Sequence, residues 1–277
     1  MGIGVQKWSK KAQTISGVFR LFSLYVVDYL FMKQSASGGE MRTMPKWFYD
    51  EMKHSGVDYT NPAQVQVYDI RHQTFRDYKK ASEVIIEKLN LGREHTVIDI
   101  GSGTGAFAIN AAPKCKHIYA VDVSQPMLDY SRQKAEQLGI HNITFCHGGF
   151  LTYEHRHELS DAIVSVAVLH HLPDFWKLLG LQRAANMLKP RGRLFLFDVV
   201  FPSNLTGYET SFNSWIQSMA DKAGAEFAAE AEIHIRDEHS TFDWIMEGLL
   251  ERAGFKIDQA EYADGFGASY LCTKTVE

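Results

Sequence analysis

The sequence predicts an α/β protein with an open, twisted, mostly parallel sheet and helices on both faces. Three observations lead to this fold class: short apolar runs rich in β-branched residues, segments of helical periodicity between them, and a glycine-rich turn after the first run. Such runs are typical of strands that are buried on both faces of a parallel sheet. In sheets of this kind ligands bind at the carboxyl ends of the strands.

Five strands alternate with helices in the middle of the chain. The strands are predicted at residues 96–100, 117–121, 143–146, 161–166 and 193–200. Helices are expected from the glycine-rich turn to about residue 112, at 125–138 and at 175–187, with a turn at 189–192. An earlier helix is expected over about 62–90, ending near Leu91-Gly92 because glycine suits a helix C-terminus.

Residues 1–80 are interpreted as an N-terminal helical extension, and residues 81–277 as the main domain. Apolar residues recur at helical spacing over 15–31 and cover both sides of that helix, which predicts packing on the core or on a second subunit in a homodimer. A peripheral membrane contact, helped by nearby lysines, is the alternative. Arg20 and Asp28 interrupt the apolar stretch, and it is too short for a transmembrane span.

Composition narrows the classes of partner. The formal net charge of -4 and the isoelectric point of about 6.3 provide no basic field for nucleic acid. Three widely spaced cysteines, with no C-x-x-C pair, indicate reduced thiols in the cytoplasm. Twelve histidines occur without an H-x-x-x-H or H-E-x-x-H spacing, so no metal site is expected.

Gly101, Gly103 and Gly105 lie between the first strand and the helix that follows it. Glycine lets the backbone turn sharply and approach a ligand closely, so the segment predicts a loop for a nucleoside cofactor. Gly101-x-Gly103-x-x-Ala106 nearly matches the dinucleotide fingerprint, which leaves a nicotinamide cofactor open. A tight turn that binds no ligand is the third interpretation.

Two carboxylates accompany this loop. Asp99 lies inside the first strand, where it can receive the ammonium group that S-adenosylmethionine carries and a dinucleotide lacks. Asp122 ends the second strand, 21 residues after Gly101 (122 − 101), and can accept hydrogen bonds from both hydroxyls of a ribose. Asp122 thus favours a nucleoside ligand without choosing between the two cofactors.

The order of the motifs is more specific than any one of them. Residues 97–107, 120–128, 161–174 and 188–194 resemble the successive motifs of the class I S-adenosylmethionine-dependent methyltransferase family, in its type 11 and ubiquinone-methyltransferase-like small-molecule branch. Residues 249–255 and 268–274 are similar to the family's last helix and closing hairpin. The resemblance implies a Rossmann-like, doubly wound sheet of seven strands, the final one antiparallel, and methyl transfer from S-adenosylmethionine to a small-molecule acceptor.

The resemblance also implies roles for individual residues. It assigns the loop of Gly101, Ser102, Gly103 and Gly105 to the cofactor, together with Asp99, and Asp122 to its ribose. It places the remaining cofactor contacts at Val123, Met127, Gly149 and Phe150 around the adenine, and at Val166 and Ala167 along the methionine arm. The family usually has an acidic residue at the position of Gly149, and this chain reads His-Gly-Gly-Phe at 147–150.

Methyl transfer needs alignment of the acceptor more than a catalytic side chain, and a general base is optional. His171, next to His170 after the fourth strand, is the predicted base; the alternative is a structural turn in which one ring bonds the backbone. Tyr68 is the second predicted catalytic residue, from a lid that includes Arg71 and Tyr78. Glu238 and His239 either face the pocket or form a solvated charged turn.

An insertion at about 201–240 is expected to shape the acceptor pocket, by resemblance to the family. Its apolar stripe indicates a partly apolar or aromatic acceptor, although core packing explains it as well: Phe212, Trp215, Ile216 and Met219. Three other functions stay open. They are a non-catalytic S-adenosylmethionine-binding regulatory protein, an NAD(P)-dependent oxidoreductase, and a methyltransferase acting on protein or nucleic acid.

Overall fold

The computed structural model describes residues 44–53, 65, 77–204, 206–263 and 266–275. The chain divides into two compact units, residues 1–48 and 49–277, and every element named below belongs to the second. The predicted helix at 15–31 lies outside the described residues, as do Tyr68 and Arg71. The border predicted at residues 80 and 81 falls inside the second unit. No helix among the described residues combines the length and apolar character needed to cross a membrane.

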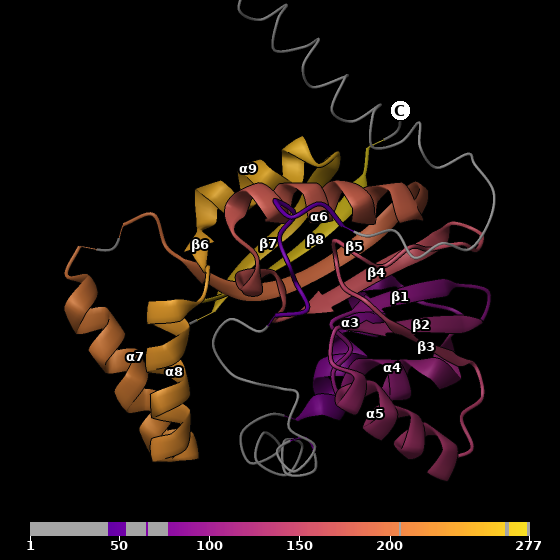
Figure 1. Ribbon diagram of the computed structural model, residues 1–277, viewed down its shortest axis with the longest axis horizontal. Coiled ribbons are helices and arrows are strands. Elements are labelled where there is room, and N and C mark those ends of the chain that lie inside the picture. Colours follow the sequence, from indigo (N-terminus) through magenta and orange to yellow (C-terminus); the bar gives the residue numbers. More distant parts are fainter. Residues whose placement is uncertain (1–43, 54–64, 66–76, 205, 264–265, 276–277) are drawn as a thin grey trace, which may run out of the picture. The chain divides into compact units, whose positions relative to one another are not determined.

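A single sheet organises the second unit (Figure 1). Its main path runs β3-β2-β1-β4-β5-β8-β7, and β8 lies antiparallel to both of its neighbours. A two-residue strand, β6, pairs in parallel with the end of β5. The strands are β1 (Thr96–Ile100), β2 (His117–Asp122), β3 (Ile143–His147), β4 (Ser160–Val166), β5 (Leu188–Phe201), β6 (Thr241–Phe242), β7 (Phe255–Ala263) and β8 (Gly267–Lys274). The path confirms the predicted seven-stranded sheet, and β6 is an unpredicted addition.

Helices cover both faces of the sheet, which confirms the doubly wound, Rossmann-like architecture. In Figure 1, α3 (Tyr78–Leu89), α4 (Ala106–Ala111) and α5 (Gln125–Gln137) lie on one side, whereas α6 (Asp174–Met187) and α9 (Asp243–Arg252) lie on the other. The chain leaves β1 for β2 on one side and later returns to place β4 on the other. The carboxyl ends of β1, β2 and β4 therefore surround the point where ligands bind in such sheets.

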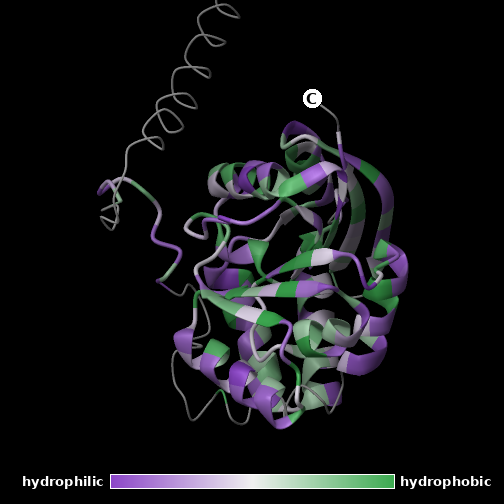
Figure 2. Cartoon of the chain, turned by 90° about the vertical axis from the view of Figure 1, so that its right-hand side faces the viewer, coloured by the Kyte–Doolittle hydropathy of each residue, from purple (hydrophilic) through white to green (hydrophobic). Residues whose placement is uncertain are grey.

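The burial of the central strands explains their sequences. Val97, Ile98 and Ile100 of β1 are fully buried, as are Ile163 and Val164 of β4, because helices cover both faces there. Figure 2 shows hydrophobic residues gathered on the strands and hydrophilic residues on the outer sides of the helices. Continuous apolar runs, rather than alternating ones, were thus the correct signal for this sheet.

Helix ends follow local side chains. Asp77 caps the start of α3, its Oδ1 accepting from the Lys80 amide at 2.9 Å. Asn90, not Gly92, takes the left-handed position at the end of this helix, with φ 50°. The helix thus ends at Leu89, within a residue of the predicted end at about 90, and the cap is asparagine instead of the expected glycine because asparagine also tolerates that conformation. The rest of the predicted 62–90 helix falls mostly outside the described residues.

The turn predicted at 189–192 is present as an irregularity inside β5. Ser160 of β4 pairs with Leu188, and Ala162 pairs with Arg193, so four residues of β5 are left out of the regular register. Arg191 has φ 61°, as expected for a turn rather than a strand. The strand proper then runs from Arg193, as predicted.

Two paired helices, α7 (Tyr208–Ala223) and α8 (Ala225–Asp237), form the insertion between β5 and β6. They stand beside the sheet at the left of Figure 1. None of the residues of α7 is buried, whereas Phe227 and Ala231 anchor α8. The insertion is thus attached to the rest of the unit mainly through α8.

Candidate functional site

The glycine turn is fixed to the neighbouring strand by its backbone. The amides of Gly101 and Ser102 both donate to the carbonyl oxygen of Val121, at 2.7 and 2.9 Å. Gly101, Gly103 and Gly105 have φ values of 76°, 51° and 78°, in the left-handed region that favours glycine. The turn therefore holds the ends of β1 and β2 together at the carboxyl edge of the sheet.

The three glycines are needed for different reasons. A Cβ on Gly101 would lie 2.1 Å from Cγ2 of Val168, and one on Gly105 would lie 2.1 Å from Oγ of Ser131. These two glycines allow the loop to pack against the chain after β4 and against α5. A Cβ on Gly103 would meet no atom of the described residues within 4 Å. The middle glycine thus faces open space, as expected where a ligand approaches the backbone.

Asp122 and Asp99 lie beside this space. Oδ2 of Asp122 accepts from the Gly103 amide at 2.7 Å, and Oδ1 accepts from the Ser124 amide at 2.8 Å. Asp99 is 3% exposed, and its Oδ2 has no hydrogen-bond partner among the described residues. Burial, reinforced by the nearby charge of Asp122, raises the pKa of Asp99 to about 8. A buried carboxyl oxygen without a partner is costly unless a ligand donates to it.

The loop after β3 carries an acidic residue that the sequence analysis missed. Oε1 of Glu51 accepts from the amides of Leu151 and Thr152, at 2.9 and 2.7 Å, and from the Thr152 hydroxyl at 2.6 Å. A Cβ on Gly149 would lie only 2.6 Å from Oε2 of Glu51 and 2.9 Å from Val123. The Glu51 carboxylate thus occupies the space of the side chain that Gly149 lacks. A separation of 98 residues (149 − 51) leaves no spacing pattern by which sequence could reveal this.

The other predicted cofactor residues surround the same edge at different depths. Val123 is half-buried and its carbonyl accepts from Nε2 of His147 at 2.9 Å, whereas Met127 is only 4% exposed. Phe150 is 1% exposed and packs against Gly180 of α6. Val166 ends β4 and is followed by Ala167, which has φ 60°. A non-glycine residue in this conformation marks local strain, which is common at functional turns.

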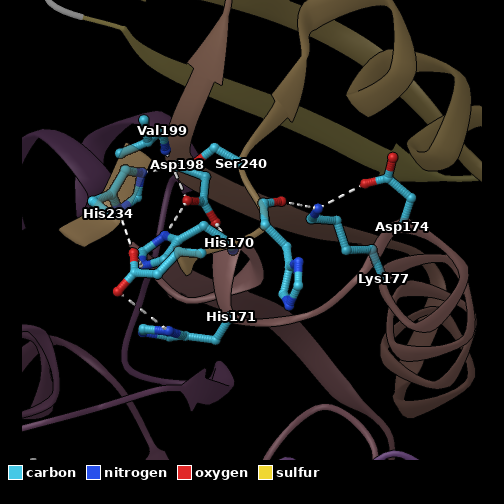
Figure 3. A network of polar contacts seen from close by, with 10 residues as sticks. His170, His171, Asp174, Lys177, Asp198, Val199, His234 and Ser240 are labelled. Atoms are coloured by element: carbon cyan, nitrogen blue, oxygen red, sulfur yellow. Dashed lines mark hydrogen bonds and ion pairs between the residues drawn. The ribbon is translucent and has the colours of Figure 1, made fainter. Parts of the chain in front are cut away.

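The histidine turn follows directly. His170 is 7% exposed, and its Nδ1 lies 2.6 Å from Oδ1 of Asp198 in β5. The His170 amide also donates to Oδ2 of that carboxylate at 3.2 Å. The alternative of a ring bonded to the backbone is therefore wrong for His170, because a buried carboxylate is its partner. Figure 3 shows His170, Asp198 and His234 converging from three segments of the chain.

Glu238 completes the group. Its side chain is 3% exposed, and its Oε2 contacts Nδ1 of His234 and lies 3.5 Å from Nε2 of His170. Its Oε1 lies 3.9 Å from Nδ1 of His171. The interpretation of Glu238 as part of a solvated turn is therefore wrong. His234 was missed, although its position four residues before Glu238 places both side chains on one helix face.

These contacts fix the charges. Burial opposes the charged form of His170, but the carboxylates of Asp198 and Glu238 outweigh it and raise the pKa of His170. Burial, together with the neighbouring His170, lowers the pKa of His171 to about 3. The pKa values of Asp198 and Glu238 are lowered, because the facing imidazoles outweigh the effect of burial. His171 is thus neutral at physiological pH and a weak base.

His239 fixes the same turn by its backbone. Its amide donates to the carbonyl oxygen of His170 at 2.7 Å, and its carbonyl oxygen accepts from Nζ of Lys177. Lys177 is fully buried and is paired with Asp174 at 2.7 Å. Tyr49 donates to the carbonyl oxygen of His171 at 2.9 Å. The predicted residue Tyr78 begins α3, and its carbonyl accepts from Ser82.

An aromatic cluster adjoins the histidines. The ring of Phe212 lies 5.3 Å from Phe201 and 5.4 Å from Phe266, and Trp215 lies 5.4 Å from Phe266. Trp215 also meets His234, with ring centroids 5.9 Å apart. Phe212, Trp215, Ile216 and Met219 are all half-buried, so the predicted apolar stripe forms a wall beside the polar group instead of a sealed core.

Known proteins share this fold and these motifs. Residues 97–192 match a family model described as a methyltransferase domain. The chain is 23% identical over 201 residues to the demethylmenaquinone methyltransferase of Listeria welshimeri, covering 72% of this chain and 80% of that protein.

Solved structures show the same fold at lower identity. An S-adenosylmethionine-dependent methyltransferase from Clostridium acetobutylicum is 16% identical, with a TM-score of 0.59, over 77% of this chain and 98% of that one. A counterpart from Aquifex aeolicus is 17% identical, with a TM-score of 0.55, over 78% and 99%. With a glycine turn, a paired Asp122 and a buried Asp99 at the edge of this sheet, the chain is similar to the class I S-adenosylmethionine-dependent methyltransferases, and its residues 97–192 match their methyltransferase domain.

Proposed function

We propose that the protein methylates a small molecule bound at the carboxyl edge of β1, β4 and β5. The single observation that carries this proposal is the open space over Gly103, in the turn that follows the strand of Asp99, whose buried Oδ2 has no hydrogen-bond partner among the described residues. When bound, S-adenosylmethionine supplies an electrophilic methyl group on a sulfonium sulfur. The protein's part is to orient the two reactants and to exclude water.

The residues at this edge fit the parts of the cofactor. Asp99 offers its carboxylate to the ammonium group, and Asp122 offers its carboxylate to the ribose hydroxyls. The adenine is proposed to lie among the residues after β2 and β3, and the methionine arm at the end of β4: Val123, Met127, Gly149, Phe150, Val166 and Ala167. Oε2 of Glu51, beside Gly149, is placed to accept from the adenine amino group in place of the acid that the β3 loop lacks.

The acceptor is proposed to lie between the histidine turn and the aromatic wall of α7. Its partly apolar surroundings favour a small molecule with a ring, and the relative from Listeria welshimeri is named for such an acceptor. His171, neutral and partly exposed, is proposed to contact the acceptor. The net charge of -4 speaks against nucleic acid. A role for Tyr68 stays a prediction.

The location in the cell and the oligomeric state are also proposed. Cys115, Cys146 and Cys272 are free thiols, which supports the reducing environment of the cytoplasm as the site of action. A homodimer formed through residues 15–31 is proposed on the apolar pattern of that segment alone. Light scattering on the full chain and on a chain lacking residues 1–43 tests it, and equal masses per particle apart from the deletion would contradict it.

The test of the cofactor site is calorimetry with S-adenosylmethionine, S-adenosylhomocysteine and NAD. The wild type should bind both adenosyl ligands and leave NAD unbound. Asp122→Ala should weaken their binding by about 1.5–3 kcal/mol, the value of hydrogen bonds to a charged group. Asp129→Ala, an exposed carboxylate on α5, is the matched control. Unchanged affinity in Asp122→Ala would exclude Asp122 as the ribose ligand.

The acceptor class is tested by turnover. The protein is incubated with S-adenosylmethionine and panels of quinols and phenols, of peptides and of oligonucleotides, and released S-adenosylhomocysteine is measured by mass spectrometry. Turnover confined to the small-molecule panel is expected. Turnover with oligonucleotides or peptides alone would overturn the proposed acceptor class, and tight NAD binding without adenosyl binding would overturn the proposed function.

A further inference from the structure

Three side chains near the proposed acceptor site can approach one point. His170, His171 and Glu238 each offer one atom, and these atoms all lie within 4.8 Å of one another. The two histidines are consecutive after β4, while Glu238 follows α8, so the group forms only in the folded chain. An adjacent pair of histidines with a distant glutamate matches neither the H-x-x-x-H nor the H-E-x-x-H spacing, so sequence spacing does not predict this group.

The separations suit a small metal ion. Nε2 of His170 lies 3.5 Å from Oε2 of Glu238, and Nδ1 of His171 lies 3.9 Å from Oε1. Ligands at about 2.0–2.2 Å from a tetrahedral Zn²⁺ are roughly 3.3–3.6 Å apart. The 3.5 Å separation falls within this range, and the 3.9 Å separation is slightly longer.

The surroundings orient these ligands. Nδ1 of His170 is bonded to the Asp198 carboxylate, which leaves Nε2 of His170 directed to Glu238. The Asp198 carboxylate is itself held by the amides of His170 and Val199. His234 contacts Glu238 in the same way (Figure 3 shows His234 beside His170). A carboxylate on the far nitrogen of a histidine is the usual outer support of a metal-binding imidazole.

The charge of the group also suits a cation. With neutral imidazoles, the buried carboxylates of Asp198 and Glu238 contribute two negative charges, and nearby Lys177 is already paired with Asp174. Buried charges persist when they are paired or coordinate a metal. A divalent ion neutralises both carboxylates. A proton on His170 is the competing explanation, and it neutralises only one.

We propose that His170, His171 and Glu238 bind one divalent transition-metal ion of the Zn²⁺ class. Two imidazoles and one carboxylate are a ligand set for such ions, and three protein ligands leave a coordination position open. The opening is on the side of His171, whose side chain is 27% exposed against 8% for His170 and 3% for Glu238.

The metal ion would take part in the proposed methyl transfer by binding the acceptor, and this role rests on the proposed function. Val168, two residues before His170, touches Gly101, so the site adjoins the cofactor loop. Trp215, in contact with His234, brings the aromatic wall to the same place. The open position would take an oxygen donor of the acceptor, such as a phenol or enol hydroxyl. A bound metal would lower the pKa of such a hydroxyl and make a strong base unnecessary.

Metal binding is tested on the full chain without cofactor. Protein freed of metal by chelation is titrated with Co²⁺, followed by visible absorption, and with Zn²⁺, followed by calorimetry. One equivalent of each is expected. His171→Ala and Glu238→Gln should weaken binding more than about 100-fold, and Asp198→Asn about 10–100-fold, the range for an outer-shell partner. His157→Ala, which removes an exposed histidine elsewhere, should bind like the wild type.

Thermal melting and affinity for S-adenosylhomocysteine are measured for every variant. His171→Ala, at the most exposed ligand, serves if Glu238→Gln does not fold. Absence of Co²⁺ uptake by folded wild type, or equal uptake by His171→Ala, would overturn the metal site and leave only the protonated His170 pair. Retained S-adenosylhomocysteine binding in that case would leave the proposed function standing. Folded protein that binds Co²⁺ but no S-adenosylhomocysteine would instead fail the proposed function alone.

Discussion

The carboxyl edge of the sheet has two regions, the proposed cofactor end at β1, β2 and β3 and the proposed acceptor end at β4 and β5, and they are formed by different kinds of chemical group. At β1, β2 and β3, the groups proposed to hold the cofactor are backbone amides, glycines and carboxylates that lie close to strand ends. At β4 and β5, they are buried imidazoles and carboxylates that meet from segments up to 68 residues apart (238 − 170). A site made of backbone groups depends little on the identity of surrounding side chains. A side-chain cluster can be replaced piece by piece, as an acceptor site must be when acceptors differ.

The largest expected effect is a loss of stability, which should be greater at Gly101, a glycine packed against the chain, than at Gly103, a glycine that faces open space. Gly101→Ala places a Cβ against Val168 in a left-handed backbone, which should lower the free energy of unfolding by about 2–5 kcal/mol. Gly103→Ala has only the conformational penalty of about 1–2 kcal/mol. Urea denaturation measures both, and S-adenosylhomocysteine affinity is read on the folded fraction. Equal stability losses would show that the loop does not press on the chain after β4.

A pH dependence probes the buried carboxyl of the cofactor end. The pKa of Asp99 rises to about 8 in the folded protein, so the native state keeps a proton that the unfolded chain releases. Its contribution favouring the folded state is complete below about pH 4 and is lost as the pH rises to about 8, at no more than about 1.4 kcal/mol per pH unit.

Asp99→Asn removes this titration. The stability of the variant relative to wild type should therefore increase between about pH 5 and 8, measured by denaturant unfolding without ligand. Asp129→Asn, an exposed residue on α5, should leave the wild-type slope unchanged. Parallel stability curves for wild type and Asp99→Asn would mean that the carboxyl is already ionised in the native protein.

The smallest expected change in affinity concerns Glu51. This residue is far in sequence from the other residues of the proposed cofactor end. In Glu51→Gln, the amide oxygen is retained by the Leu151 and Thr152 donors, so the amide nitrogen takes the position of Oε2. Affinity for S-adenosylhomocysteine should fall by about 0.5–1.5 kcal/mol. Affinity for the inosine analogue, with an acceptor in place of the amino group, should rise. Glu154→Gln, in the same loop but exposed, is the control.

The local structure of the proposed cofactor end could be predicted from sequence because its parts are close together in the chain. Glycines at 101, 103 and 105 and the acid at 122 follow directly from strand ends, and strands 96–100 and 117–121 fall within a residue of β1 and β2. Backbone geometry at a strand-to-helix turn leaves a short, repeated signature.

The acceptor end could not be read in this way. His170 and His171 were visible as candidates, but their partners Asp198, His234 and Glu238 have no fixed spacing to them. The charged sequence Arg-Asp-Glu-His predicts an exposed glutamate, but Glu238 is buried in the fold. The sequence around Glu51 does not predict that its carboxylate lies beside Gly149. Long-range packing, which a single sequence does not encode as a pattern, decided each case.

The contact between Gly101 and Val168 makes the two ends neighbours in a mechanical sense. A ligand that shifts the glycine turn would therefore shift Val168, two residues before His170, and a ligand that shifts Val168 would shift the turn. Because such energetic coupling is reciprocal, whichever molecule arrives first must alter the hold on the second by the same factor. Through this one side-chain contact, donor and acceptor binding are expected to influence each other to the same extent in either order.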